Sequence, residues 1–260
     1  MKKDPTQITA VRTRLLGLPM IRQEKDRLWG FMTRSFWWFC AFSLALLSLG
    51  FYEAVFIAPV EATMGSIYRI FYWHVPINIS AEILPYANLA ASVAFLFTRR
   101  TKPVLAAKLD AFALATAEVT VLYVGVGLLT GMIWARPVWG IWWAWDERLT
   151  SFLLLFLLYV SYLLIRQFSS HQAPLIAAVL SVFAGIDVPI VFMSIRWWRT
   201  QHPAPVLTGD GSLDASMWPA FLWNLAAWFF WGCTLIWARY VIANREHQAV
   251  ERRALETMEA

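Results

Sequence analysis

Residues 111–133 read AFALATAEVTVLYVGVGLLTGMI, and residues 134–150 continue as WARPVWGIWWAWDERLT. The first stretch carries one charged side chain, Glu118, and exceeds the ~20 residues that a helix needs to cross a bilayer. In all, we count six apolar segments, at about 36–58, 78–97, 111–133, 149–166, 174–195 and 219–241. Only 15% of the chain is charged, against about 25% in soluble proteins. We therefore predict an all-α integral membrane protein with six transmembrane helices.

Positive charges are distributed unequally between the two sides of this predicted membrane domain. Of the 22 lysines and arginines, 17 fall in the tails and loops of one side and five in the loops of the other. Lysine and arginine concentrate in cytoplasmic loops. Both termini are thus predicted to be cytoplasmic, with the tryptophan-rich segment at the outer face between helices three and four. The net charge of +5 reflects this topology, and we expect no nucleic-acid-binding surface.

Three regions follow along the chain. Residues 1–35 are predicted to be a basic cytoplasmic tail with an amphipathic helix near its end, 36–241 the six-helix domain, and 242–260 a cytoplasmic C-terminal tail. The first apolar segment starts too late for a cleavable signal peptide. Cys40 and Cys233 fall in predicted helices, without a C-x-x-C or C-x-x-C-H motif. Neither thiol-redox chemistry nor covalent haem attachment to this chain is supported.

Each of the three outer loops carries unusual residues. The first, about 59–77, contains SIYRIFYWHVP with His74, and the third, about 196–218, contains RWWRTQHP with His202. The second holds five tryptophans within twelve positions: Trp134, Trp139, Trp142, Trp143 and Trp145. If that segment is helical, with Pro137 in its first turn, one face carries Trp139, Trp142, Trp143 and Asp146. Such a face suits a planar aromatic ligand, and a tryptophan belt at the membrane interface is the competing interpretation.

The histidines and arginines of these loops suggest a ligand for that face. Two imidazoles approaching a planar ring from opposite sides are what a bis-histidine haem needs, although an interfacial polar role also fits His74 and His202. His171 and His247 fall on the cytoplasmic side and are expected to be solvated. Outer arginines could bind propionates or lipid phosphates. Those considered for propionates are Arg69, Arg136 and Arg148.

Other polar and small residues allow structural interpretations. Asp146 could cap the following helix or pair with Arg148. Glu82 and Asp187 could border a path for haem, although hydrogen bonding between helices is the more ordinary role. No role is assigned to Glu118. The glycines of the third segment favour close helix packing: Gly125, Gly127 and Gly131.

The string WGIWWAWDERLTS at residues 139–151 closely resembles the WWD signature of haem-handling proteins in cytochrome c biogenesis. Within that superfamily, residues 60–240 resemble the CcmC family of haem exporters in the system I maturation pathway. The resemblance includes SIYRIFYWHVP before and around His74, and VPI followed by RWWRTQH before His202. Six helices and cytoplasmic termini also fit. Departures are a longer basic N-terminal tail and the residues Gln201 and Pro203 beside His202.

The resemblance implies a haem-binding protein that is not itself an enzyme. It implies that His74 and His202 are the axial ligands of haem b, held without a covalent bond as transient cargo. The implied WWD haem surface comprises Trp139, Gly140, Trp142, Trp143, Trp145 and Asp146. Haem would be presented at the periplasmic face of a bacterial inner membrane and passed to the chaperone CcmE, with CcmA, CcmB and CcmD as partner subunits. A mitochondrial inner membrane is an alternative location.

Three other classes of protein are alternatives for this sequence. A structural membrane subunit of an ABC-type complex would use the tryptophans as a docking surface. A membrane b-type cytochrome would place histidines inside helices, and no predicted helix interior contains one. A secondary transporter would show broken helices in two matching halves, of which the sequence gives little sign.

Overall fold

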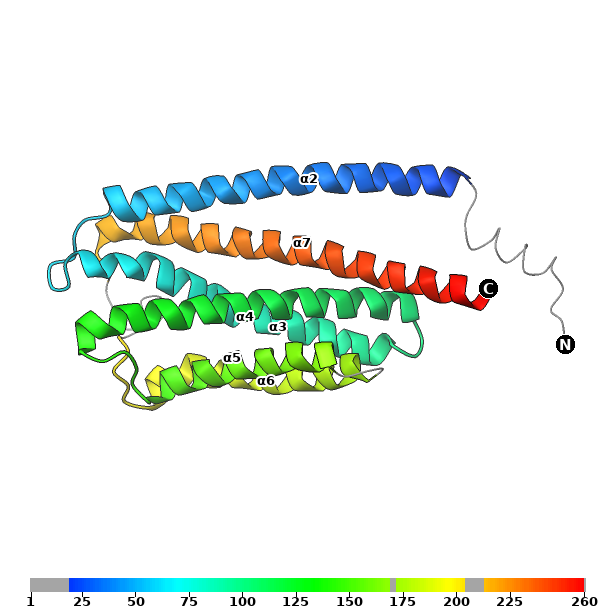
Figure 1. Cartoon of the computed structure of the whole chain (residues 1–260). Coiled ribbons are helices and arrows are strands. Elements are labelled where there is room, and N and C mark those ends of the chain that lie inside the picture. The colour runs from blue at the N-terminus through cyan, green and yellow to red at the C-terminus, as the bar shows by residue number, and fades with distance from the viewer. Residues whose placement is uncertain (1–18, 169–171, 204–212, 260) are drawn as a thin grey trace. The chain divides into compact units, whose positions relative to one another are not determined.

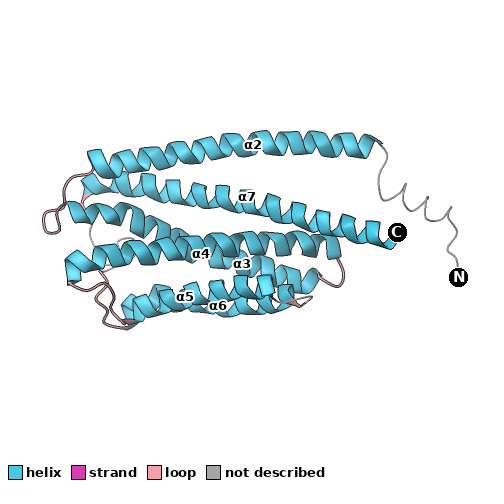
Figure 2. Cartoon of the chain, in the orientation of Figure 1, coloured by secondary structure: helices cyan, strands magenta, loops and turns pink. Residues whose placement is uncertain are grey.

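The computed structural model describes residues 19–168, 172–203 and 213–259, and side chains from Arg34 to Ala243 and at Arg245 within those ranges. The expectation for His171 lies outside the described residues, as does that for the side chain of His247. The described part of the chain is helical, with one isolated antiparallel bridge between Glu61 and Gly65 and no strand (Figure 2).

Six long α-helices, three short helical turns and their connections make up the described chain (Figure 1). The α-helices are α2 (Pro19–Tyr52), α3 (Phe71–Thr98), α4 (Pro103–Trp139), α5 (Glu147–Phe168), α6 (Ala173–Trp197) and α7 (Trp218–Glu259). A π-helical turn, η1 (Glu53–Ile57), follows α2. The 3-10 turns η2 (Ser66–Ile70) and η3 (Ala215–Met217) precede α3 and α7.

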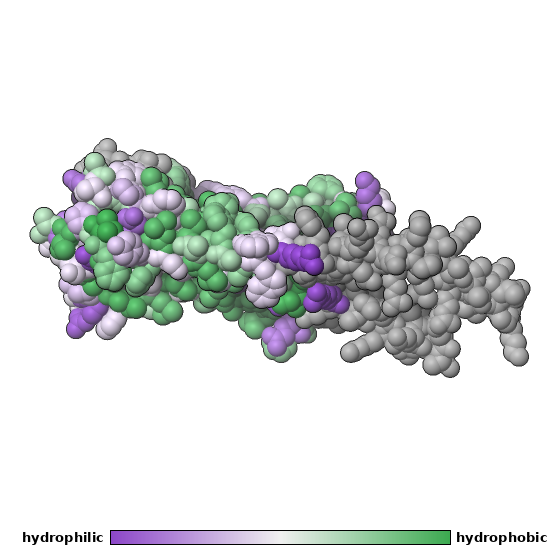
Figure 3. Space-filling view, turned by 90° about the horizontal axis from the view of Figure 1, so that it is seen from above, coloured by the Kyte–Doolittle hydropathy of each residue, from purple (hydrophilic) through white to green (hydrophobic). Residues whose placement is uncertain are grey.

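The predicted number of membrane spans is confirmed. Six helical segments of the described chain are long and apolar enough to cross a bilayer: 34–57, 66–98, 103–139, 147–168, 173–197 and 215–243. Figure 3 shows hydrophobic residues over much of the described surface on the face in view, as expected where lipid tails replace water. The chain divides into two compact units, Met1–Phe42 and Ser43–Ala260. All the site residues discussed below belong to the second unit.

The tryptophan-rich segment is not one helix, so the predicted shared face is wrong. Helix α4 extends through Pro137 and ends at Trp139, because Gly140 adopts a left-handed conformation with φ of 78° and closes the helix. Residues 141 and 142 form a bend, residues 143–146 have no regular secondary structure, and α5 begins at Glu147. Helical spacing cannot be continued past Gly140, so Trp139, Trp142, Trp143 and Asp146 do not share a helix face.

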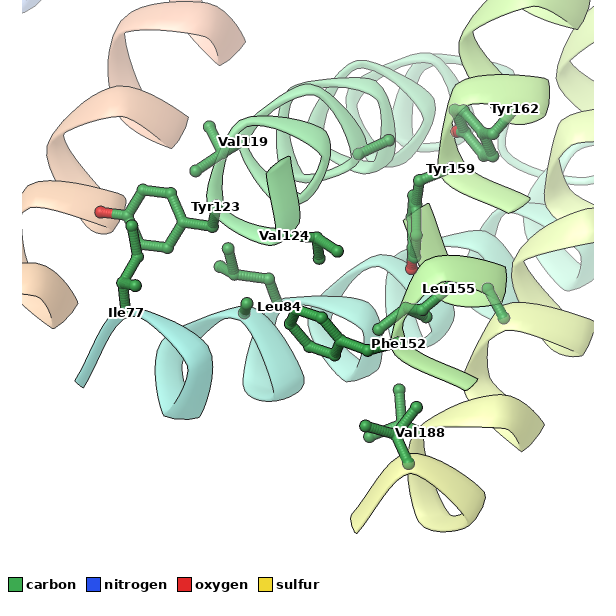
Figure 4. Close-up of a cluster of buried hydrophobic side chains, with 14 of the residues drawn as sticks. Ile77, Leu84, Val119, Tyr123, Val124, Phe152, Leu155, Tyr159, Tyr162 and Val188 are labelled. Atoms are coloured by element: carbon green, nitrogen blue, oxygen red, sulfur yellow. The ribbon is translucent and has the colours of Figure 1, made fainter. Parts of the chain in front are cut away.

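The core of the second unit lies between α3, α4, α5 and α6 (Figure 4). Ile77 and Leu84 of α3 face the same cluster as Tyr123 of α4 and Leu155 of α5. The hydroxyl of Tyr123 donates a 2.8 Å hydrogen bond to the Trp228 carbonyl of α7, so the ring fills the core while its polar end is satisfied.

Three carboxylates of the spans pair with arginines of other helices. Asp110 of α4 accepts two hydrogen bonds, of 2.7 and 2.8 Å, from Arg166 of α5. Glu118, to which the sequence assigned no role, pairs with Arg239 of α7. Asp187 of α6 is buried, and its Oδ2 has no partner among the described residues. Pairing between helices therefore accounts for Glu82, Asp110 and Glu118.

Candidate functional site

A cavity is lined by residues of α3, α4 and α5, of the connection before α5, and of the segment after α6. Its atom-free space is about 510 Å³ when the open mouth is included. Residues distant in the sequence meet there. Its lining includes His74, Asn78, Trp139, Trp143, Arg148 and His202.

His74 lies in the first turn of α3, not in the outer loop where the sequence analysis put it. The turn η2 and then α3 begin before the HVP sequence, and Pro76 is buried inside the helix. Prolines are tolerated in membrane helices where neighbouring groups satisfy the freed backbone. A helix-borne histidine has a more fixed position than one on a loop. The sequence argument against a b-type cytochrome, that no helix interior contains a histidine, therefore no longer holds.

Both ring nitrogens of His74 are hydrogen-bonded. Nδ1 lies 2.9 Å from Thr130 Oγ1 of α4, and Nε2 lies 3.0 Å from Asn78 Nδ2, one turn further along α3. An amide nitrogen can only donate, so Nε2 accepts and Nδ1 carries the proton. The Thr130 hydroxyl then accepts from Nδ1 and donates to the Val126 carbonyl at 2.8 Å. This chain of bonds selects the tautomer with its lone pair on Nε2.

Glycines of α4 provide the space for these side chains. A Cβ at Gly127 would lie 1.9 Å from Asn78 Oδ1, and one at Gly131 would lie 3.1 Å from His74 Cε1. Both contacts are too close for an unchanged arrangement. The close packing predicted for these glycines is therefore present, and it occurs at the cavity wall. Gly125 meets Phe156 of α5 and is not among the lining residues.

The tryptophans of the WWD segment divide into two groups. Trp139 and Trp143 line the cavity, together with Trp134, whose ring packs edge-on against Trp139 at 5.3 Å. Trp142 and Trp145 are 58% and 78% exposed. Gly140 is exposed and sets the turn between the groups. Of the four tryptophans predicted to form the haem surface, Trp139 and Trp143 are therefore the two among the cavity-lining residues.

Asp146 connects the segment before α5 to the segment after α6. Its Oδ1 accepts a 2.8 Å hydrogen bond from the Leu149 backbone N–H, which caps α5 as the structural interpretation predicted. Its Oδ2 accepts a 3.2 Å hydrogen bond from the Gln201 backbone N–H. The carboxylate thus holds the residue beside His202 against the start of α5.

His202 comes to the cavity from the segment that follows α6. Its Nδ1 lies 3.0 Å from the Pro203 carbonyl oxygen, which can only accept, so the proton is on Nδ1 and the lone pair on Nε2. Burial and the positive charge of Arg148 lower the pKa of His202 to about 4, against an opposing effect of Asp146. The imidazole is therefore neutral near pH 7, as a metal ligand must be. Both histidines offer Nε2 as the ligating atom.

Of the three arginines considered for propionates, Arg148 alone is among the cavity-lining residues. Its guanidinium donates to Glu82 Oε1 at 2.8 Å and to the Val191 carbonyl at 2.6 Å. Arg69 instead donates to the carbonyls that end the first span, and Arg136 to the Gly140 carbonyl. Glu82 thus accepts a hydrogen bond from Arg148 of another helix, which agrees with the role expected for it.

Sequence reasoning missed several residues of this site. Asn78 lies four residues after His74, a spacing that brings side chains together on a helix, but the loop assignment hid this relation. Thr130 belongs to another span, and nothing in the sequence pairs it with His74. Trp134 was counted in the tryptophan cluster without being assigned to the haem surface.

Comparison with known proteins bears on what this site is for. Residues 22–256 match the sequence model of the family described as Heme exporter protein C. The chain belongs to the heme exporter protein C family. The matched range contains the whole cavity lining and both histidines.

Two of the individual relatives carry the same description, and a third has a related name. Heme exporter protein C of Bradyrhizobium diazoefficiens is 33% identical over 229 residues, which cover 86% of this chain and 82% of the relative. Heme exporter protein C of Escherichia coli K12 is 29% identical over 201 residues, covering 76% and 79%. A Marchantia polymorpha protein named as ccmC-like, mitochondrial and for cytochrome c biosynthesis is 31% identical, covering 74% and 84%.

Proposed function

We propose that this member of the heme exporter protein C family binds haem b in the cavity and passes it to the chaperone CcmE. Membership of the family implies haem delivery for cytochrome c maturation. The observation that carries the finer proposal is that His74 and His202, from distant parts of the chain, line one cavity with their lone pairs on Nε2. A porphyrin supplies four nitrogens to iron, so two imidazoles complete its coordination.

The surroundings of the histidines also suit haem. Trp139 and Trp143 offer aromatic faces to a macrocycle, with ~0.5–1.5 kcal/mol per aromatic contact beyond area burial. Arg148 is the cation of the lining and would meet a propionate. Trp143 Nε1 is buried without a hydrogen-bond partner among the described residues, so it is a second donor for a carboxylate.

Handover requires a site that a partner can reach. We infer that the exposed Trp142 and Trp145 form part of the surface on which CcmE docks, because they continue the same segment as the cavity tryptophans. In this proposal the termini are cytoplasmic, the cavity opens to the periplasm, and CcmA, CcmB and CcmD complete the assembly. The chain then acts as a carrier and presenter of haem rather than as an enzyme.

A docking subunit without haem is the second candidate. The exposure of Trp142 and Trp145 favours it, since large apolar surface outside the cavity needs a membrane or protein partner. It does not explain why Thr130 and Asn78 orient His74 in the cavity. A b-type cytochrome could use His74 on its helix, yet His202 follows α6 in a non-helical segment.

A transfer experiment tests the proposal. The full chain in lipid nanodiscs is loaded with haem, mixed with the soluble domain of CcmE, and separated to measure haem on each protein. We expect transfer from the parent and none from the double variant His74→Ala/His202→Ala. Arg99→Ala is the control, because this exposed arginine lies at the opposite end of α3 from His74 and outside the cavity lining, and it should transfer normally. A parent that binds CcmE but carries no haem would support the docking subunit instead.

A further inference from the structure

The atom of His74 that would bind iron already has a neighbour. Asn78 Nδ2 donates to the Nε2 lone pair across 3.0 Å. One lone pair cannot serve an amide N–H and an iron ion together. We propose that Asn78 is a displaceable cap on His74 Nε2, which competes with iron and keeps haem binding weak enough for release. This inference rests on the proposed function and explains how the same site could release haem.

The carboxamide of Asn78 is held on one side only. Its Oδ1 is buried and has no hydrogen-bond partner among the described residues. It lies against α4 at Gly127, where a Cβ would come within 1.9 Å. Asn88, ten residues later on α3, differs: its Nδ2 donates to the Ala113 carbonyl at 2.6 Å, and its Oδ1 accepts from Tyr159. A side chain with one hydrogen bond is the easier one to displace.

The other nitrogen of His74 is unaffected by such an exchange. Thr130 continues to accept from Nδ1 and keeps both the tautomer and the ring direction while Asn78 leaves Nε2. The Nε2 lone pair is then available to iron without a change of protonation. The net value of one ordinary hydrogen bond corresponds to a change in affinity of about three- to tenfold. That is the size of effect expected from removing the cap.

Haem release from the full chain in detergent measures this competition. The parent and its variants are loaded with haem, excess apomyoglobin is added as a scavenger, and transfer is followed by absorbance. Asn78→Leu removes the donor at similar size and should slow release about three- to tenfold with a bis-histidine spectrum. Asn78→Asp places an acceptor at Nε2, favours the tautomer protonated there, and should speed release. Asn88→Leu, a buried asparagine outside the cavity lining, should leave the rate unchanged.

The outcomes separate this inference from the proposed function. Equal or faster release from Asn78→Leu, with the bis-histidine spectrum kept, overturns the cap alone. A parent that takes up no haem overturns both. Nitrogen NMR of the histidine-labelled parent without haem gives a test that needs no variant to fold. A proton on His74 Nδ1 supports the cap, and a proton on Nε2 overturns it.

Discussion

Asp146 joins the start of α5 to the segment that carries His202. Asp146→Ala removes both acceptors, and the lost helix cap alone costs about 1 kcal/mol of stability. The Gln201 N–H also loses its anchor, so His202 is held less firmly. We predict a lower haem-to-protein ratio in purified Asp146→Ala, with Asp146→Asn between it and the parent.

The matched control for this prediction is Asp214→Ala. Asp214 is an exposed N-cap that accepts from the Ser216 N–H at the start of η3, and it is not among the cavity residues. Its loss should lower thermal stability without changing haem content. Full haem content in Asp146→Ala would show that the carboxylate does not position His202.

Arg148 is expected to have a structural and a ligand-binding role that mutation can separate. Arg148→Gln leaves the partly buried carboxylate of Glu82 without its partner, at a cost of about 3 kcal/mol. The double variant Arg148→Gln/Glu82→Gln removes both charges and should recover most of the stability. We predict that haem affinity, measured by optical titration, stays low in the double variant. Recovery of affinity along with stability would mean that Arg148 acts only through its ion pair.

At the scale of elements, α4 supplies the wall against which His74 lies. Gly131→Val would push a side chain into the His74 ring, whose Cε1 is 3.1 Å from the position of a Cβ. We predict about tenfold weaker haem binding, equivalent to ~1.4 kcal/mol. Gly125→Ala on the same helix meets Phe156 and should bind haem like the parent. Equal binding by the parent and Gly131→Val in optical titration would contradict this account of the wall.

Elements that depend on local composition could be predicted from the sequence. All six spans follow from apolar runs of sufficient length, and the structure confirms them. The helical assignment of residues 140–146 was wrong because the tryptophan spacing outweighed Gly140, a residue typical of helix ends. His74 was assigned to a loop because the apolar segment was counted from residue 78, whereas α3 begins at Phe71 and accommodates Pro76.

Contacts between elements were beyond prediction from one sequence. The sequence selected His74, His202 and the tryptophans as a group, and the structure places both histidines and part of the tryptophans at one cavity. It gave no sign that Asp146 reaches Gln201, or Thr130 reaches His74, because these pairs are 55 and 56 residues apart. Such partners depend on how the helices pack rather than on any local pattern.

At the scale of the whole molecule, the membrane orientation remains a prediction from charge distribution. In a background with Cys40 and Cys233 replaced by serine, single cysteines are introduced as Ile141→Cys and Thr101→Cys, both at exposed positions. Because the lysines and arginines concentrate on the side of Thr101, we expect a membrane-impermeant thiol reagent to label only Ile141→Cys from outside. Labelling of Thr101→Cys alone would invert the orientation and move the cavity to the cytoplasmic side.

The proposed function requires one cavity of this membrane domain to hold haem between His74 and His202. An optical spectrum of the detergent-purified chain supplied with haem, beside His74→Ala and His202→Ala, tests it most directly. We predict a six-coordinate low-spin spectrum in the parent and a five-coordinate high-spin spectrum, or loss of haem, in each variant. A parent without haem absorption, or variants whose spectra match the parent's, would contradict the claim.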